Sequence, residues 1–154
     1  MSETTIDETV RIWKDFVDNT GNWQELVKGV EPKQTQCGPV YEPVSPLDRP
    51  NESFAISDMR KVKLATPHYH KGGETEIYIV VSGTGITVVG GEVLTLEPGM
   101  ICVTPPNIAH FTIPQKDLVL VVINTPPFKP ENVVDVTDSN PEVGFDAQQL
   151  SRLV

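Results

Sequence analysis

The chain has 154 residues, of which 38% are hydrophobic and 21% charged, and this composition is typical of one globular domain. Its formal net charge of −9 disfavours binding to nucleic acid or to an anionic membrane, which carry the same sign of charge. No run approaches the roughly 20 apolar residues that span a bilayer, and the acidic N-terminus lacks the pattern of a secretion signal. Cys37 and Cys102 lack CxxC spacing and fit a reducing compartment, so we expect a cytoplasmic protein.

The first 30 residues have helical patterns. Between residues 5 and 18 apolar residues recur every three or four positions, which predicts a helix with one apolar face. Thr5 and Glu8 have capping-box spacing, and Gly21 can end the helix. Asn22 and Gly29 bound a further short helical turn. We therefore expect a helical extension over 1–30 that packs on the main body.

From residue 31 onward the pattern is that of an antiparallel β domain, because Pro, Gly and Asn separate short runs rich in Val, Ile and Thr. Gly90 and Gly91 suit the tight turn of a hairpin, and Pro98-Gly99 suits a type II turn. The expected strands cover residues 52–57, 59–66, 74–82, 85–89, 92–96, 100–104, 109–114 and 117–124. Eight short strands over residues 31–125 favour an all-β barrel or double-sheet jelly roll.

The last segment, residues 126–154, is rich in proline and has a weak helical pattern. We expect it to form an extended arm that wraps the barrel or crosses to a partner. The expected apolar anchors of this arm are Phe128, Val133, Val134 and Phe145.

The three histidines of the chain are placed so that they can converge. His68 and His70 are one residue apart, so on an extended backbone both side chains point to the same face. Glu74, Glu76 and Tyr78 share one face of the next strand by the same period of two, and His110 follows a Pro-Pro turn that returns the chain to the barrel. Neutral imidazoles and a carboxylate suit divalent Mn, Fe, Ni, Zn or Co, so the sequence predicts a metal site.

These residues resemble the two sequence motifs of the cupin superfamily. The first motif, G-x5-H-x-H, three or four residues, E, six residues and G, is matched by His68, His70, Glu76 and Gly83. The second, G-x5-P-x-G-x2-H-x3-N, is matched by Gly99, Pro105 and His110. The resemblance covers about residues 50 to 125. It implies a double-stranded β-helix and metal ligands His68, His70, Glu76 and His110.

The sequence departs from the first motif at two points. Val62 stands where the first glycine is expected, and five residues rather than four separate His70 from Glu76. Glu74 satisfies that spacing but puts Val81 at the place of the closing glycine, so Glu76 is the preferred ligand and Glu74 the alternative. Glu74 is then a rim residue or, with Tyr78, a candidate for moving a proton.

The second motif is also altered. Asn107 replaces a glycine, which is tolerable because asparagine enters the left-handed region more readily than most residues. Pro114 stands where the motif has asparagine, and this position is not a ligand.

The resemblance leaves three functions open, because cupins share a fold and differ in chemistry. The compact layout is similar to small cupins related to mannose-6-phosphate isomerase, which implies a metal-dependent sugar or sugar-phosphate isomerase. In that case Glu74 and Tyr78 would move protons, and a phosphate would meet basic side chains from the set Arg60, Lys61, Lys63 and Lys71.

The alternatives are an Fe(II)-dependent dioxygenase and a non-catalytic module that binds a metal or small ligand. For all three we expect a small-molecule partner and no nucleic-acid or membrane partner. Because jelly-roll cupins commonly pair by edge strands, and an exposed strand edge is a liability, we also expect a homodimer.

Overall fold

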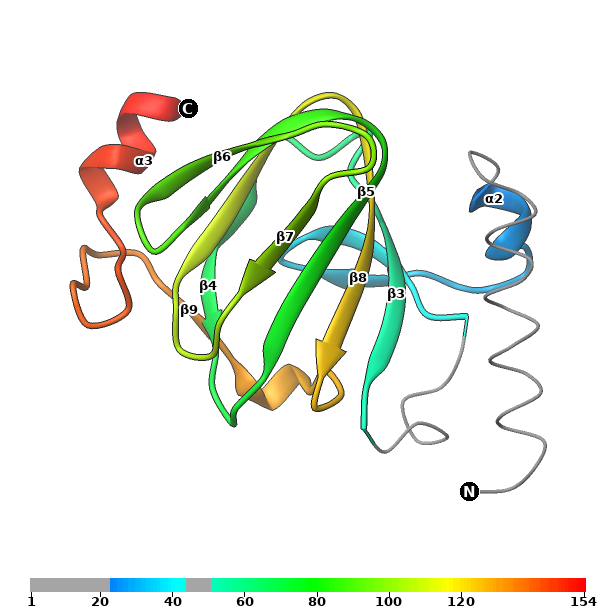
Figure 1. Cartoon of the computed structure of the whole chain (residues 1–154), viewed down its shortest axis with the longest axis horizontal. Helices are drawn as coiled ribbons and strands as arrows, with labels where there is room; N and C mark the ends of the chain where they lie inside the picture. The colour runs from blue at the N-terminus through cyan, green and yellow to red at the C-terminus, as the bar shows by residue number, and fades with distance from the viewer. Residues whose placement is uncertain (1–22, 44–50) are drawn as a thin grey trace.

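One curled sheet dominates the computed structural model, which describes residues 23–43 and 51–154. The elements in chain order are α2 (Trp23–Leu26), β1 (Lys33–Thr35), β2 (Gly38–Tyr41), β3 (Ser53–Asp58), β4 (Ala65–His70), β5 (Thr75–Val89), β6 (Glu92–Leu96), β7 (Ile101–Thr104), β8 (His110–Thr125), η2 (Pro130–Asn132), β9 (Val133–Asp135) and α3 (Ala147–Leu153). Figure 1 shows the strands rolled into a barrel with α2 and α3 on opposite sides of it. The all-β jelly-roll prediction is confirmed.

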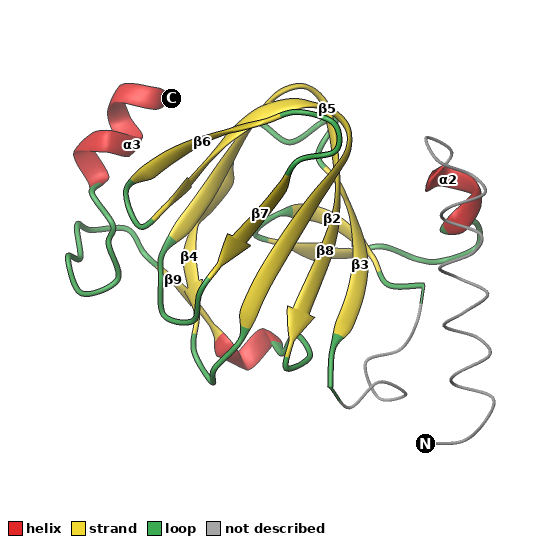
Figure 2. Ribbon diagram, viewed as in Figure 1, coloured by secondary structure: helices red, strands yellow, loops and turns green. Residues whose placement is uncertain are grey.

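Two long antiparallel strands form the spine of the sheet. β5 and β8 pair from Thr75↔Thr125 to Val89↔His110, with register shifts between Val80 and Gly85. On its other edge β5 pairs with β6 and β7, while β8 pairs with β3 and β4 (Figure 2). The spine therefore bends at the shifts, as bulged strands do, and each long strand contributes to both ends of the barrel.

Several strand boundaries differ from the prediction. The expected strands over 74–82 and 85–89 are one strand, β5, and those over 109–114 and 117–124 are one strand, β8. The glycines and proline that suggested breaks lie at bulges, where pairing shifts register but continues.

The strand expected over 59–66 is wrong in its first part. Residues 59–62 form a turn closed by the bond from Val62 N to Met59 O (3.1 Å), and β4 begins at Ala65. Residues near Val62 thus still form a turn, although the motif glycine is absent.

Both predicted glycine turns are confirmed. Gly90 and Gly91 have φ of 57° and 88° and join β5 to β6. Gly99 has φ of 88°, and Met100 N donates to Glu97 O at 3.0 Å across the Pro98-Gly99 turn. Asn107 has φ of 60°, which is the left-handed conformation that its position requires.

The inner face of the sheet holds the main apolar core. Side chains alternate as expected from Glu74, just before β5, into the strand, so that Glu74, Glu76, Tyr78 and Val80 are buried while the residues between them are only half-buried. Tyr78 and Val80 pack with Leu118, Leu120 and other residues inside the barrel. Polar and apolar side chains therefore share one inner face, the polar ones near the end where β5 begins.

The outer face is covered in part by the N-terminal segment. Trp23 and Val27, in and just after α2, pack on Ile56, Val119 and Val121 of the sheet. The predicted short helix is confirmed there, and Gly29, with φ of 80°, ends it. The helix predicted over 5–18, with Thr5, Glu8 and Gly21, and the Asn22 cap lie outside the described residues.

The C-terminal segment folds back on its own barrel. β9 pairs with β4, and Phe145 is buried against Phe111, with ring centroids 6.4 Å apart. α3 then begins after Asp146, whose side chain accepts a hydrogen bond from Gln148 N at 2.9 Å. The arm is therefore extended only in part, because Asp146 caps a helix that the weak apolar pattern did not predict.

None of the helices in the described residues has the length and apolar character needed to cross a membrane.

Candidate metal centre

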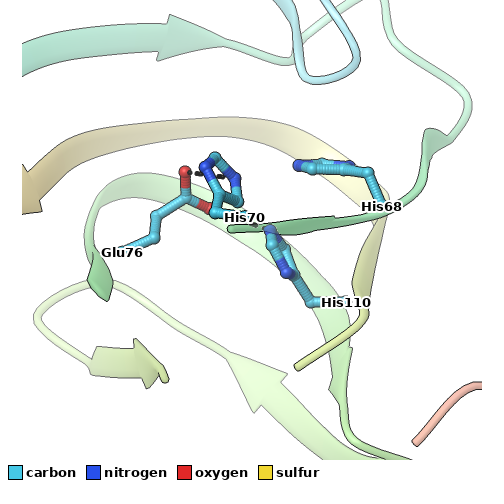
Figure 3. A group of neighbouring side chains, drawn as sticks. All are labelled: His68, His70, Glu76 and His110. Carbon is cyan, nitrogen blue, oxygen red and sulfur yellow. Dashed lines mark ion pairs between the residues drawn. The ribbon is translucent and has the colours of Figure 1, made fainter. Parts of the chain in front are cut away.

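The three histidines and Glu76 meet at one end of the barrel. His68 and His70 lie on β4, Glu76 on β5, and His110 at the start of β8. β4 and β8 pair with His68 opposite His110, which brings the two rings to a centroid distance of 4.3 Å. Figure 3 shows the four side chains pointing toward one another.

The four side chains form a tight and buried group. One ligand atom from each lies within 4.8 Å of all the others, and none of the four residues is more than 4% exposed. His110 Nε2 is 3.0 Å from Glu76 Oε1, and His70 Nε2 is 3.4 Å from Glu76 Oε2. The structure thus brings together the set preferred from the sequence, with Glu76 rather than Glu74 as the carboxylate.

Hydrogen bonds on the far side of each ring fix which nitrogen faces the group. His68 Nδ1 is 2.7 Å from Thr66 O, His110 Nδ1 is 3.3 Å from Ile108 O, and His70 Nδ1 is 2.8 Å from Glu74 Oε2. Since these oxygens only accept, each neutral ring carries its proton on Nδ1 and presents a lone pair at Nε2. This is how metal-binding histidines are held in proteins.

Three atoms of the group lack a hydrogen-bond partner within the described part of the chain, although they are fully buried. They are His70 Nε2, His110 Nε2 and Glu76 Oε1. A buried polar atom without a partner is costly. A cation at the centre of the group would satisfy all three at once.

The electrostatics of the group favour an ionised carboxylate. Burial raises the pKa of Glu76, but His110, His70 and His68 beside it outweigh burial and bring this pKa well below its usual range. Burial, with a smaller effect of His110, lowers the pKa of His68 to about 3, so this ring is neutral. Burial also lowers the pKa of His70, but Glu74 and Glu76 together outweigh it and raise this pKa above 6.5.

The donor set fits a divalent transition metal. Imidazole nitrogen and carboxylate oxygen are ligands for Mn, Fe, Co, Ni and Zn, and the group has three of the first and one of the second. The His68–His70–Glu76–His110 group could therefore hold a metal ion. For a six-coordinate metal, four protein ligands leave positions open, which is typical of catalytic rather than structural sites.

A pocket opens on this group. Its lining includes three members of the group, His68, His70 and Glu76. The other lining residues come from the β1–β2 hairpin, β3, β8 and the segment after β8, namely Lys33, Thr35, Cys37, Val40, Glu42, Ser53, Ala55, Val122, Asn124 and Phe128.

Most of these other lining residues were not predicted from the sequence. The β1–β2 hairpin is short, and the only local sign of its turn is Gly38, whose φ is 83°. Asn124 was also missed, although its Nδ2 donates to Glu76 Oε2 at 3.3 Å. Nothing local marks this asparagine, because it meets Glu76 only through the β5–β8 pairing.

The two proton-transfer candidates do not line the pocket. Glu74 is 1% exposed, so it is not a rim residue, and it bonds His70, Lys129 and Asn132. Tyr78 is 2% exposed in the apolar core, with its hydroxyl 3.7 Å from Cys37 Sγ. Burial, with smaller effects of Cys37 and Glu76, raises the pKa of Tyr78 well above 10, so the phenol stays protonated.

The four basic side chains considered for a phosphate are exposed and lie outside the pocket lining. Arg60 forms two hydrogen bonds of 2.9 Å to Asp58, and its guanidinium carbon lies 4.9 Å from the centre of the Trp23 ring. Arg60 therefore helps to hold α2 on the outer face. Lys61, Lys63 and Lys71 are the other three.

Comparisons with known proteins agree with this geometry. The family model described as "Cupin domain" matches residues 59–124, whereas no curated protein matches the chain. Similar solved structures include the Streptomyces nucleoside dehydratase Pac13 (TM-score 0.60, 16% identity, covering 71% of this chain and 87% of that one). Another is a protein from Planctomyces limnophilus (TM-score 0.61, 21% identity, 70% and 90%). A third is a predicted oxalate decarboxylase from Thermotoga maritima (TM-score 0.56, 19% identity, 64% and 95%). Residues 59–124 of the chain thus form a cupin domain.

Proposed function

We propose that this chain is a metal-dependent enzyme that acts on a small molecule bound in the pocket. The observation that carries the proposal is that the pocket lining and the buried metal-ligand group share residues, namely His68, His70 and Glu76. A molecule in the pocket would therefore contact the group directly. A purely structural metal site would have no need of such access.

When bound, a divalent metal would supply Lewis acidity or, as Fe(II), one-electron chemistry. The protein's own part is to hold and shield the site. The Nδ1 bonds orient the three rings, and Asn124 orients the carboxylate of Glu76. Val40, Ala55 and Val122 contribute apolar surface to the pocket lining.

Among the open reaction classes, the geometry gives most support to an Fe(II)-dependent dioxygenase. The two proton-transfer candidates, Glu74 and Tyr78, lie outside the pocket lining. Much of the wall is apolar, including Val40, Val122 and Phe128. Chemistry that relies on the metal rather than on a protein acid or base suits such a pocket.

A sugar-phosphate isomerase is the second candidate, on different residues from those the sequence suggested. Lys33 and Glu42 form an ion pair in the pocket lining. A lysine could meet a phosphate and a carboxylate could move a proton. The similar folds include a nucleoside dehydratase and a predicted oxalate decarboxylase, so the fold alone accommodates more than one reaction.

The test begins with metal content. The chain is purified anaerobically without added metal, analysed for elements, and assayed with Fe(II) for oxygen uptake in the presence of a panel of small organic acids, thiols and phenols. A parallel assay uses sugar phosphates with Mn(II), Ni(II) or Zn(II). His68→Ala should abolish metal binding and activity, whereas Lys71→Ala, on an exposed neighbour of His70, should leave both unchanged.

The results separate the candidates. Oxygen uptake that depends on both Fe(II) and substrate supports the dioxygenase, and turnover of a sugar phosphate without oxygen supports the isomerase. Metal binding without either activity leaves a non-catalytic binding module. A wild-type chain that binds none of these metals after reconstitution would refute the proposal.

A further inference from the structure

Glu74 is a buried carboxylate that does not line the pocket. Its hydrogen bonds nevertheless reach a residue of the metal-ligand group and the segment after β8. The residue is 1% exposed and accepts three hydrogen bonds. One oxygen, Oε2, lies 2.8 Å from His70 Nδ1. The other, Oε1, accepts from Lys129 N at 3.0 Å and from Asn132 Nδ2 at 2.9 Å.

The bond to His70 distinguishes this ring from the other two. His68 and His110 bond main-chain carbonyls two residues away, whereas His70 bonds a side chain that is itself held by a distant segment. A carboxylate can only accept at Oε2, so the neutral ring must keep its proton on Nδ1. Its Nε2 lone pair is then directed toward Glu76 and the rest of the group.

The segment on the other side of Glu74 carries a wall of the pocket. Phe128 lines the pocket, and its ring centroid lies 5.9 Å from that of His70. Phe128 N donates to Ser53 Oγ at 2.9 Å, and Lys71 N donates to Asn132 O at 2.9 Å. The approach of Asn132 is close: a Cβ on Gly72 would lie 2.7 Å from Asn132 Nδ2.

We propose that Glu74 is a positioning residue that joins the metal ligand His70 to the wall segment, residues 128–132, whose Phe128 lines the pocket. Oε2 of this carboxylate fixes the tautomer of the His70 ring, and Oε1 holds the wall segment by accepting from Lys129 N and Asn132 Nδ2. Loading the metal site and ordering the wall are therefore coupled events. The statement about metal loading rests on the proposed function, whereas the hydrogen bonds of Glu74 to His70, Lys129 and Asn132 do not depend on it.

The isosteric variant Glu74→Gln gives the sharpest test. An amide keeps the volume but has a single acceptor, whereas three donors converge on this side chain. If its NH2 group faces His70, the ring must shift its proton to Nε2, where it blocks metal binding. If the NH2 group faces Lys129 and Asn132, the wall loses its anchor. Asn132→Ala is the matched control, because it removes one donor at Oε1 and leaves the bond to His70 intact.

Two readouts are measured on both variants and on the wild type. The first is the affinity for Zn(II), by competition with a chromophoric chelator. We expect Glu74→Gln to weaken it by about 10- to 100-fold, as the loss of such a bond commonly does, and Asn132→Ala, which keeps the Lys129 bond to Oε1, to weaken it much less. The second is the tautomer of His70 in metal-free protein, from long-range ¹H–¹⁵N spectra about two pH units above the ordinary imidazole pKa of 6.5. We expect Nδ1–H in the wild type and in Asn132→Ala. In Glu74→Gln we expect Nε2–H if the amide NH2 faces His70, or Nδ1–H with weakened Zn(II) binding if the NH2 faces Lys129 and Asn132.

Hydrogen exchange on the wild type tests the coupling without any variant, and so stands even if Glu74→Gln does not fold. Zn(II) should slow exchange at the Lys129 amide, which bonds Glu74, and leave the Met100 amide in the distant Pro98-Gly99 turn unchanged. Exchange at Lys129 that does not respond to bound Zn(II) would overturn the coupling. Wild-type affinity and an Nδ1–H tautomer in Glu74→Gln would overturn the positioning role and leave the proposed function standing. A wild type that binds no Zn(II) would contradict the proposed function, while the tautomer result would still decide the role of Glu74.

Discussion

Replacing Gly83 by alanine should unfold the barrel at a markedly lower temperature. Gly83 sits in the bulged part of β5, where φ is 75°. An added Cβ would lie 2.2 Å from Asp117 O and 2.3 Å from Lys116 O, both main-chain atoms of β8 that cannot turn away. A left-handed backbone costs an alanine about 1 kcal/mol, and forcing the strands apart costs about 1 to 3 kcal/mol more.

The sum is a loss of about 2 to 4 kcal/mol, which for a chain of this size lowers the melting temperature by roughly 5 to 15 °C. Gly73→Ala is the matched control, because Gly73 has φ of 76° but no atom within 4 Å of an added Cβ. It should lose only the conformational part, about 1 kcal/mol and roughly 2 to 4 °C.

Both variants are compared with the wild type by thermal unfolding followed by circular dichroism, in the presence of a chelator so that metal binding does not contribute. Equal shifts for Gly83→Ala and Gly73→Ala would show that the approach of Asp117 to Gly83 costs nothing, and would refute the reasoning.

Three further predictions concern pH, thiol reactivity and self-association. Glu74 and Glu76 outweigh burial and raise the pKa of His70 above 6.5. Because a proton on this ring competes with the metal, the affinity for Zn(II) should keep rising as the pH increases above 6.5. An affinity that is constant above pH 6.5 would contradict this. The proton on His70 also stabilises the metal-free fold. Its contribution to the free energy of unfolding is fully present below pH 6.5 and is lost as the pH rises through the raised pKa of His70. Burial, aided by Glu76, raises the pKa of Cys37 to about 12, so native Cys37 should resist iodoacetamide and react only after unfolding, as mass spectrometry can show. Ile101 and Val103 are 65% and 52% exposed on β7, which pairs only with β5 within the described chain. Because an exposed apolar edge strand favours pairing with a second copy, light scattering should show a homodimer, and Ile101→Lys should disrupt it. A monomeric wild type would contradict this prediction.

Short-range periodicity was sufficient to predict the inner face of the site. The period of two placed Glu76 and Tyr78 of β5, and Glu74 just before it, on one side, and the H-x-H spacing placed both histidines of β4 together. The turns at Gly90-Gly91 and Pro98-Gly99 were likewise predictable, since only a few residue types accept a positive φ.

Other features depend on contacts between distant segments and have no local signal. β1, β2 and β9 are only three or four residues long, and they are strands because of the partners that they meet. β5 and β8 continue through bulges that look like chain breaks in the sequence, because cross-strand pairing holds them together.

The choice between Glu74 and Glu76 shows this division most clearly. Both carboxylates point inward by the same periodicity, and sequence motifs alone favoured one without excluding the other. In the tertiary structure Glu74 is held by His70, Lys129 and Asn132, whereas Glu76 meets His110 and Asn124. The sequence by itself determined which residue types face the interior, because that follows from the backbone repeat. Only the folding of β8 and the C-terminal segment against β4 and β5 decided which carboxylate joins the histidines.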